Sequence, residues 1–233
     1  MTSYTENLQD LITRVRFVLW DFDGPICRLF AGHSAESVTA ELVGWLDGRG
    51  LEEALTPEER KTADPHEVLR AIHDRYPGSG LMAELEAQLT LQELRAASSA
   101  KATDGAERLV RAWAERGACL AVTTNNAPEA ARRYLAECGL ERFFGPHVYG
   151  RTQDPSLLKP HPDCLRRALT ALGADPSDSL MFGDGPSDLE AARRAGVAFV
   201  GYARNGRKER LLRGAKAEHI VLSLDEVLRG LKG

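Results

Sequence analysis

The sequence predicts an α/β protein, a doubly wound parallel sheet with an all-helical segment inserted after its first strand. Three observations lead to this fold class. Short apolar runs that end at polar residues recur along the chain, as expected for strands buried on both faces of a parallel sheet. From about residue 101, helical patterns alternate with these runs. Between residues 28 and 100 the patterns are helical throughout.

Length and composition fit this interpretation. A chain of 233 residues can hold one α/β domain with an insertion, or two small domains. Its 43% hydrophobic and 27% charged residues exclude a disordered chain or a rod. The net charge is −4, from 30 basic and 34 acidic residues, and lacks the basic footprint of a nucleic-acid binder. We therefore expect a small anionic ligand, with no nucleic-acid, membrane or obligate protein partner.

The cysteines and the N-terminus indicate a cytoplasmic protein. The four cysteines are scattered without a C-x-x-C pair and predict reduced, mostly packed thiols. They are Cys27, Cys119, Cys138 and Cys164. The first residues contain no basic segment followed by an apolar one, and no stretch approaches the ~18 apolar residues of a membrane helix.

The first strand is the run Phe17–Trp20. Residues 1–14 form a polar lead-in, in which Leu8, Leu11 and Ile12 predict a turn of helix. The strand stops at Asp21 and Asp23, which Gly-Pro follows. Two carboxylates in a partly desolvated place are costly unless a cation or hydrogen-bond donors lie beside them. A hard, oxygen-preferring cation such as Mg²⁺ suits such a pair.

The inserted segment predicts helices only. Ser34 is a plausible N-cap for a helix that ends at Gly48. Thr56-Pro57-Glu58-Glu59 is a capping box with proline at the first helical position. Asp64-Pro65-His66-Glu67 repeats this start signal for a helix that stops at Tyr76-Pro77-Gly78, and a longer helix runs from Leu81 to about Ala97. No strand is expected in this segment.

Strands and helices alternate in the remainder of the chain. The expected strands are residues 119–122, a short one near 148–149, 179–182, 197–200 and 219–222. The expected helices carry Leu109 to Gly117, Pro128 to Gly139, Leu165 to Leu172, and the stretch after Asp188 to Gly196. The predicted division is therefore a core of residues 1–27 and 101–233 with a helical cap of residues 28–100.

The polar residues at the strand ends should meet. In an open parallel sheet the carboxyl ends of the strands lie on one edge, where ligands bind. Three apolar runs stop at polar groups that lie far apart in the sequence: Asp21/Asp23, Thr124/Asn125 and Asp184/Asp188. The predicted topology thus brings these side chains to one crevice.

Four motifs in this order resemble the signatures of the haloacid dehalogenase-like phosphatases. They are Asp21-Phe-Asp23-Gly, Thr124-Asn125, Lys159-Pro160 and Gly183-Asp184-x-x-x-Asp188. The resemblance spans residues 16 to about 201, and the inserted helices resemble that family's mobile cap. It implies a Rossmann-like core and Mg²⁺-dependent hydrolysis of a small phosphate monoester through an aspartyl-phosphate.

The resemblance also implies roles for the acidic residues. Asp21 would be the nucleophile, and Asp23 would protonate the leaving alcohol and later take a proton from water. Asp184 would join Asp21 and the main-chain carbonyl of Asp23 around Mg²⁺. Asp188 would support the metal site, although Ser187-x-x-Glu190 is a capping box that could equally explain an acid in a first helical turn.

The resemblance further implies that the substrate phosphate is bound by Thr124, Asn125 and Lys159. Thr124 and Asn125 stand between a strand end and a helix N-terminus, where backbone N–H groups and the dipole favour phosphate, and Thr123 is the alternative register for Thr124. Lys159 would neutralise the phosphoryl group.

Other polar residues carry weaker predictions. The six histidines predict surface or packing roles, with His161 the one nearest the predicted site in sequence. The basic cluster from Arg204 to Arg213 indicates a solvated helix face. Arg28 and Arg49 are the candidates for contacting the rest of the substrate.

Two departures and two alternatives remain open. Pro25 replaces the usual residue after the glycine and removes a backbone N–H, and Gly185-Pro186 replaces a common serine. Asp23 argues against haloacid dehalogenation, which a family variant without this acid performs. The alternatives are a phosphomutase acting on a sugar phosphate and a low-turnover module that binds phosphate esters.

Overall fold

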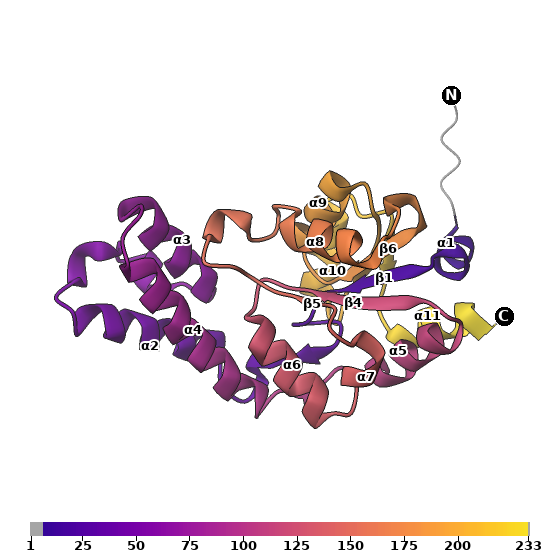
Figure 1. Ribbon diagram of the computed structural model, residues 1–233, viewed down its shortest axis with the longest axis horizontal. Coiled ribbons are helices and arrows are strands. Elements are labelled where there is room, and N and C mark those ends of the chain that lie inside the picture. The colour runs from indigo at the N-terminus through magenta and orange to yellow at the C-terminus, as the bar shows by residue number, and fades with distance from the viewer. Residues whose placement is uncertain (1–6, 233) are drawn as a thin grey trace.

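A computed structural model describes residues 7–232 and contains one six-stranded parallel sheet in the order β5-β4-β1-β6-β7-β8 (Figure 1). The strands are β1 (Phe17–Trp20), β4 (Cys119–Thr123), β5 (Val148–Tyr149), β6 (Ser179–Gly183), β7 (Ala198–Tyr202) and β8 (His219–Val221). Their pairings are parallel throughout. The predicted fold class is confirmed.

Helices cover both faces of the sheet (Figure 1). One face carries α1 (Leu8–Arg14), α5 (Ala106–Glu115), α6 (Pro128–Glu137), α7 (Glu141–Phe144) and α11 (Leu224–Lys232). The other face carries α8 (Asp163–Leu172), α9 (Pro186–Ala195) and α10 (Gly206–Gly214). Because helices cover both faces of the sheet, most strand residues are buried and apolar.

Alternation along β1 divides its side chains between the two layers. Val18 and Trp20 pack with the first set of helices, and Leu19 packs with the second. The Trp20 ring lies 5.5 Å from the Trp113 ring and 5.1 Å from the Phe182 ring, so three aromatic side chains lie under the centre of the sheet. Burial of such rings contributes roughly 1.5–3 kcal/mol each, and it holds the carboxyl end of β1 in place.

Residues 35–97 form three helices at one end of the molecule (Figure 1). They are α2 (Ala35–Asp47), α3 (Pro65–Arg75) and α4 (Leu81–Ala97), and they enclose an apolar cluster of their own. The predicted N-caps are confirmed, because Ser34 Oγ accepts the Ser37 N–H and Asp64 Oδ1 accepts the His66 N–H. We call residues 35–97 the helical unit.

The capping box at Thr56 forms but starts no long helix. Its two reciprocal hydrogen bonds between Thr56 and Glu59 are present, yet only a 3₁₀ turn, Glu59–Lys61, follows. The chain reaches Pro65 only four residues later, where α3 begins. Because no apolar stripe follows this capping box, the chain forms a single turn there and not a long helix.

A short antiparallel pair joins the two chain segments that lead to and from the helical unit. It consists of β2 (Cys27–Arg28) and β3 (Lys101–Ala102). The prediction that the segment starting at Arg28 contains no strand is wrong at this residue. A strand of two residues has no periodicity from which it could be recognised.

Three further expectations need comment. Cys27 and Cys164 are buried as expected, but Cys119 and Cys138 are exposed, so the expectation of mostly packed thiols is half wrong. The helix α9 begins at Pro186 with Gly185 as N-cap, so the capping box predicted from Ser187 to Glu190 is also wrong. Within residues 7–232, no helix is long and apolar enough to cross a membrane.

Candidate active site

The carboxyl ends of β4, β1 and β6 lie side by side at the edge of the sheet. Trp20 pairs with Val122 on one side and with Phe182 on the other, so the residues that follow these strands emerge together. They line a cavity of about 350 Å³. All seven predicted site residues line it: Asp21, Asp23, Thr124, Asn125, Lys159, Asp184 and Asp188.

Lys159 joins two carboxylates at the floor of this cavity. Its Nζ donates to Asp21 Oδ1 at 2.7 Å, to Asp188 Oδ1 at 2.6 Å and to the Thr123 carbonyl at 3.0 Å. The side chain is only 2% exposed. Burial lowers the pKa of Lys159, but Asp188 and Asp21 outweigh burial and raise it above its usual value. Lys159 is therefore a fixed positive charge beside Asp21.

Asp188 is held by the loop that follows β6. Its Oδ2 accepts the backbone N–H groups of Asp184 at 3.1 Å and Gly185 at 3.0 Å. Pro186 occupies the first turn of α9, a position that proline favours, so the departure at this motif costs no hydrogen bond. Asp188 thus fixes both the loop and Lys159.

Three carboxylates could hold one cation. One oxygen from each of Asp21, Asp184 and Asp188 lies within 4.8 Å of the others. Burial and the neighbouring carboxylates raise the pKa of Asp21 to about 7, although Lys159 opposes them. Burial, followed by Asp188, raises the pKa of Asp184 to about 6 against the effect of Lys208. The buried, mutually repelling oxygens fit a hard cation such as Mg²⁺.

Asp23 stands apart from this trio. Its Oδ1 accepts the Leu29 N–H at 2.8 Å. Burial raises its pKa to about 6, and Asp21 adds to the rise while the Leu29 hydrogen bond opposes it. A carboxyl group with this pKa is partly protonated near neutral pH. The carboxylate of Asp23 is not in the trio, so a part in metal binding through its main-chain carbonyl stays a prediction.

The side chains predicted to bind phosphate line the cavity and also shape its loop, and phosphate binding by them stays a prediction. The Thr124 hydroxyl donates a hydrogen bond to Asn126 Oδ1 and accepts one from the Asn126 backbone N–H. The backbone N–H of Thr124 donates to the main-chain carbonyl of Tyr149. Asn125 binds the backbone of Lys159 through both side-chain atoms, at 2.7 and 3.2 Å. Both residues line the cavity, but their polar atoms already hold the loop in shape. Thr123, the alternative, is buried and its hydroxyl donates to Met181.

A side chain from the helical unit caps the N-terminus of α6. Glu93, from α4, accepts the Ala127 N–H at 2.7 Å and the Asn126 side-chain amide at 2.8 Å. It also accepts Arg151 Nη1 at 2.6 Å, and the side chains of Glu93 and Arg151 have no exposed area. Glu93 thus ties the helical unit to the chain just after Thr124 and Asn125.

Among the cavity residues that the sequence did not predict are three basic side chains. His66, Arg204 and Lys208 all line the cavity, and Lys208 Nζ lies 2.8 Å from Asp184 Oδ1. The arginines of the cluster from Arg204 to Arg213 are exposed, as expected for a solvated loop and helix face, but Lys208 is half-buried and pairs with Asp184. The signal for these residues was weak: a histidine in a first helical turn, and two cations after the strand that follows the acidic motif.

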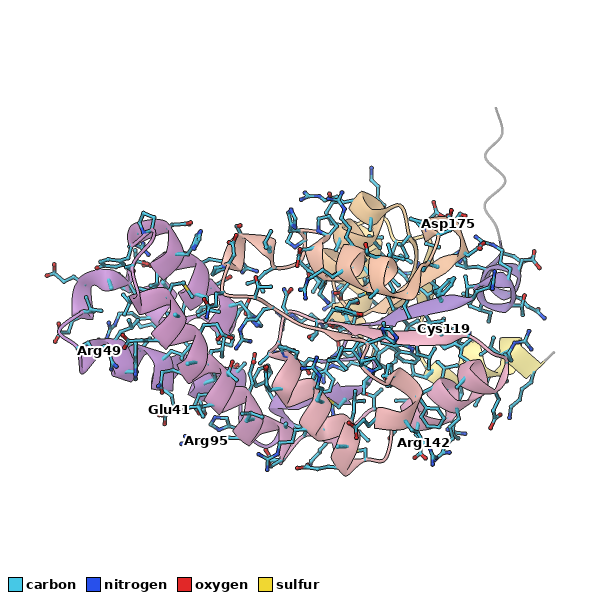
Figure 2. The ribbon with its side chains drawn as sticks, viewed as in Figure 1. Glu41, Arg49, Arg95, Cys119, Arg142 and Asp175 are labelled. Carbon is cyan, nitrogen blue, oxygen red and sulfur yellow. The ribbon has the colours of Figure 1, made fainter. Side chains whose placement is uncertain are left out.

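The residues suggested for substrate contact lie elsewhere. Neither His161, Arg28 nor Arg49 is among the residues that line the cavity. Figure 2 shows Arg49 at the outer end of the helical unit, where its guanidinium stacks 3.6 Å from the Trp45 ring centre. Arg28 lines a separate recess with Arg204.

Known proteins resemble this chain in sequence and structure. A family model for haloacid dehalogenase-like hydrolases matches residues 15–196. A pyrophosphatase PpaX from Halalkalibacterium halodurans is 33% identical over 127 residues, which cover 54% of this chain and 57% of that protein. A validoxylamine A 7'-phosphate phosphatase from Streptomyces hygroscopicus is 26% identical over 206 residues, 88% of this chain and 80% of that one. Over the first two curated relatives, the chain spans 57% and 53% of their length.

The structure of a predicted phosphatase from Clostridium acetobutylicum superimposes with a TM-score of 0.68 at 20% identity. It covers 94% of this chain and 98% of that one, so the whole fold, helical unit included, is shared.

Proposed function

The chain belongs to the haloacid dehalogenase-like hydrolase family, and we propose that it hydrolyses small phosphate monoesters with Mg²⁺ through an aspartyl-phosphate. The observation that carries this proposal is the cavity in which Asp21, Asp23 and Lys159 meet the carboxylates of Asp184 and Asp188. Phosphatases among the relatives support the same class of reaction.

Asp21 is the group placed to attack phosphorus. Its carboxylate oxygen would form a bond to phosphorus as the bond to the leaving oxygen breaks, which divides one difficult displacement into two. Asp21 Oδ1 is fixed by Lys159 at 2.7 Å, so the other oxygen is left to react. Lys159 also places positive charge where the phosphoryl oxygens would lie.

Asp23 is the group that would move the proton. In the first step its proton goes to the departing alkoxide, and in the second its carboxylate takes a proton from the water that attacks the phosphoryl group. That water releases inorganic phosphate and restores the Asp21 carboxylate. A pKa of about 6 leaves Asp23 able to serve in both steps near neutral pH.

Mg²⁺ would be held by Asp21 and Asp184, with Asp188 in support, and it would screen the repulsion between Asp21 and the phosphate dianion. The division into a core of residues 1–27 and 101–233 and a cap of residues 28–100 belongs to the same proposal, with the cap closing over the substrate. So do a small metabolite as substrate and a cytoplasmic location.

The test is phosphate release from an aryl phosphate and a panel of metabolite esters. We expect turnover that needs Mg²⁺ and that Asp21→Asn lowers by at least about a thousandfold, because the nucleophile is lost. Asp163→Asn, an acid in the first turn of α8 outside the cavity, is the matched control and should keep its rate. Metal-independent turnover or an active Asp21→Asn would overturn the proposal, and an isomerised ester without free phosphate would indicate a mutase.

A further inference from the structure

A second recess lies beside the catalytic cavity, where the chain enters and leaves the helical unit. It has a volume of about 340 Å³. One wall is formed by the β2–β3 pair and the two residues that follow it: Arg28, Ala102, Thr103 and Asp104. The other wall is the end of β7 and the loop that leads to α10: Tyr202, Arg204 and Asn205. None of the residues proposed to act on phosphorus or to hold Mg²⁺ lines this recess.

Two arginine side chains line this recess without a partner. Arg28 and Arg204 are exposed, and neither side chain makes a hydrogen bond or an ion pair within residues 7–232. They come from opposite walls, Arg28 from β2 and Arg204 from the loop after β7. Two guanidinium groups at one recess repel each other unless an anion lies between them, and their donors match the oxygens of a compact oxyanion.

The Tyr202 hydroxyl provides a neutral donor in the same recess. The residue is 8% exposed, and its hydroxyl has no hydrogen-bond partner within the part of the chain that the structure describes. The oxygen itself keeps some exposed surface, which opens into the recess. Burial, followed by Asp104, raises the pKa of Tyr202 while Arg204 and Arg28 oppose the rise, so the hydroxyl keeps its proton at neutral pH. A donor on a side chain buried to this extent usually has a partner, so it points to a ligand.

Asp104 determines which oxyanion fits the recess. Its side chain lines the recess and makes no hydrogen bond or ion pair within residues 7–232. An ionised carboxylate only accepts hydrogen bonds, so it repels a fully ionised oxyanion such as sulfate. Inorganic phosphate keeps at least one O–H group at neutral pH. This group can donate to Asp104 while the charged oxygens of the phosphate face the two arginines.

We propose that this recess is a second site for inorganic phosphate, bound by Arg28, Arg204 and the Tyr202 hydroxyl. Asp104 accepts the remaining proton of the phosphate and so excludes sulfate. The site is separate from the phosphoryl position in the catalytic cavity, although Arg204 lines both. A phosphate in the recess joins the β2–β3 pair to the loop after β7, and so ties the segments that lead to and from the helical unit to the core. Its binding requires no turnover and goes beyond the proposed function.

The test is calorimetric titration of inorganic phosphate and of sulfate into metal-free protein from which the chelator has been removed. Without a cation, the three carboxylates of the catalytic cavity disfavour an anion there, so the recess should account for the binding. We expect one phosphate per chain, bound at least about tenfold more tightly than sulfate. Arg28→Gln should weaken phosphate binding by at least about tenfold, and Asp104→Asn should reduce the preference over sulfate to less than about threefold.

Lys101→Gln is the matched control for the loss of one positive charge. Lys101 is the strand partner of Arg28, is exposed and does not line the recess, so its loss should change the Kd by less than about twofold. Tyr202→Phe removes the hydroxyl and keeps the ring, and it should weaken binding by about threefold to tenfold. It replaces Arg28→Gln if that variant does not fold. Equal losses in Arg28→Gln and Lys101→Gln, equal affinity for the two anions, or no phosphate binding up to about 20 mM overturn the proposal.

Failure of the proposed reaction would be seen separately. With Mg²⁺ added, a working catalytic site should take up a further phosphate per chain, in wild-type protein and in Arg28→Gln alike. Absence of this Mg²⁺-dependent uptake, with binding to metal-free protein retained, counts against the proposed function and supports the second site. Uptake that occurs only with Mg²⁺ and is unchanged in Arg28→Gln overturns the second site.

Discussion

At the scale of single residues, Gly24 shows how closely the site is packed. Its φ is +129°, a conformation that side chains other than glycine rarely adopt. A Cβ added there would lie 2.4 Å from Asp184 Oδ2 and 2.5 Å from its carboxyl carbon. Gly24 is therefore required both for the turn after Asp23 and for the place of Asp184.

We expect Gly24→Ala to lower phosphate release by at least about tenfold, because the new methyl group displaces Asp184. Gly50→Ala is the matched control. Gly50 also has a positive φ, +71°, but nothing lies within 4 Å of its added Cβ. Both variants should lose about 1 kcal/mol of stability from backbone strain, measured by urea unfolding. Equal activities in the two variants would show that crowding of Asp184 does not matter.

The site residues that the sequence predicted share one property: each stands directly after a buried strand or in a short motif. Asp21 and Asp184 follow runs whose burial could be recognised from composition. His66 and Lys208 could not be placed in the same way, because their positions depend on how helices pack across the cavity. The pairing of Thr124 with Asn126 depends on loop geometry that the sequence does not specify.

At the scale of elements, the contact between α4 and α6 connects the helical unit to the loop that follows β4. Glu93 lies in the last turns of α4 and caps α6 through Ala127, while Arg151 also reaches Thr90 and Glu86 of α4. Burial raises the pKa of Glu93, but Arg151 and His66 outweigh it and hold the pKa at about 2. This carboxylate is therefore ionised at neutral pH.

Glu93→Gln should destabilise the protein by about 3 kcal/mol, because it breaks a buried ion pair and leaves the Arg151 guanidinium with Glu86, which is 20% exposed, as its remaining charge partner. It should also raise KM for phosphate esters, because Asn126 loses a hydrogen bond next to the cavity. Glu84→Gln on the same helix breaks an exposed pair with Arg49 and should cost at most about 0.5 kcal/mol. Thermal and urea unfolding of both variants give the comparison, and similar losses would contradict the buried role of Glu93.

Most elements followed from the sequence because their patterns were long. The helices α2 and α3 have side-chain caps, all three of α2, α3 and α4 have apolar stripes, and their ends agree with expectation within a few residues. The pair β2–β3 was missed because its two strands have two residues each and lie 73 residues apart in the chain (101 − 28). Such a pair forms only once the chain around it has folded.

At the scale of the whole molecule, the buried charges control how stability depends on pH. The folded pKa values of Asp21, Asp23 and Asp184 are about 7, 6 and 6, all above the ordinary 3.8. At pH values between 3.8 and these folded pKa values, the folded protein holds more protons than the unfolded chain. The free energy of unfolding therefore falls as the pH rises through this range. The raised pKa of His66 acts in the same direction. The pKa values of Glu93 and Asp64 are about 2, so the contribution of these two carboxylates to folding stability is lost only in strong acid.

Metal-free protein in EDTA should therefore lose stability between pH 5 and pH 8, by on the order of a few kcal/mol, or about 5–10 °C in Tm. Asp21→Asn should weaken this dependence, and Mg²⁺ should largely remove it, because a bound cation stabilises the ionised carboxylates. Calorimetric scans at several pH values with and without Mg²⁺ measure the effect. A metal-free Tm that rises through this range would contradict the arrangement of charges.

The carboxylate of Glu93 has one more consequence, for exchanging parts between relatives. A protein engineer who wants a new specificity would graft the inserted helices of one relative onto the sheet of another. In this protein, exchanging the inserted helices would remove the Glu93 carboxylate. Its partners Arg151 and Asn126 lie outside the inserted helices and would remain. A working chimera must carry an acid at the position of Glu93, or replace Arg151 as well.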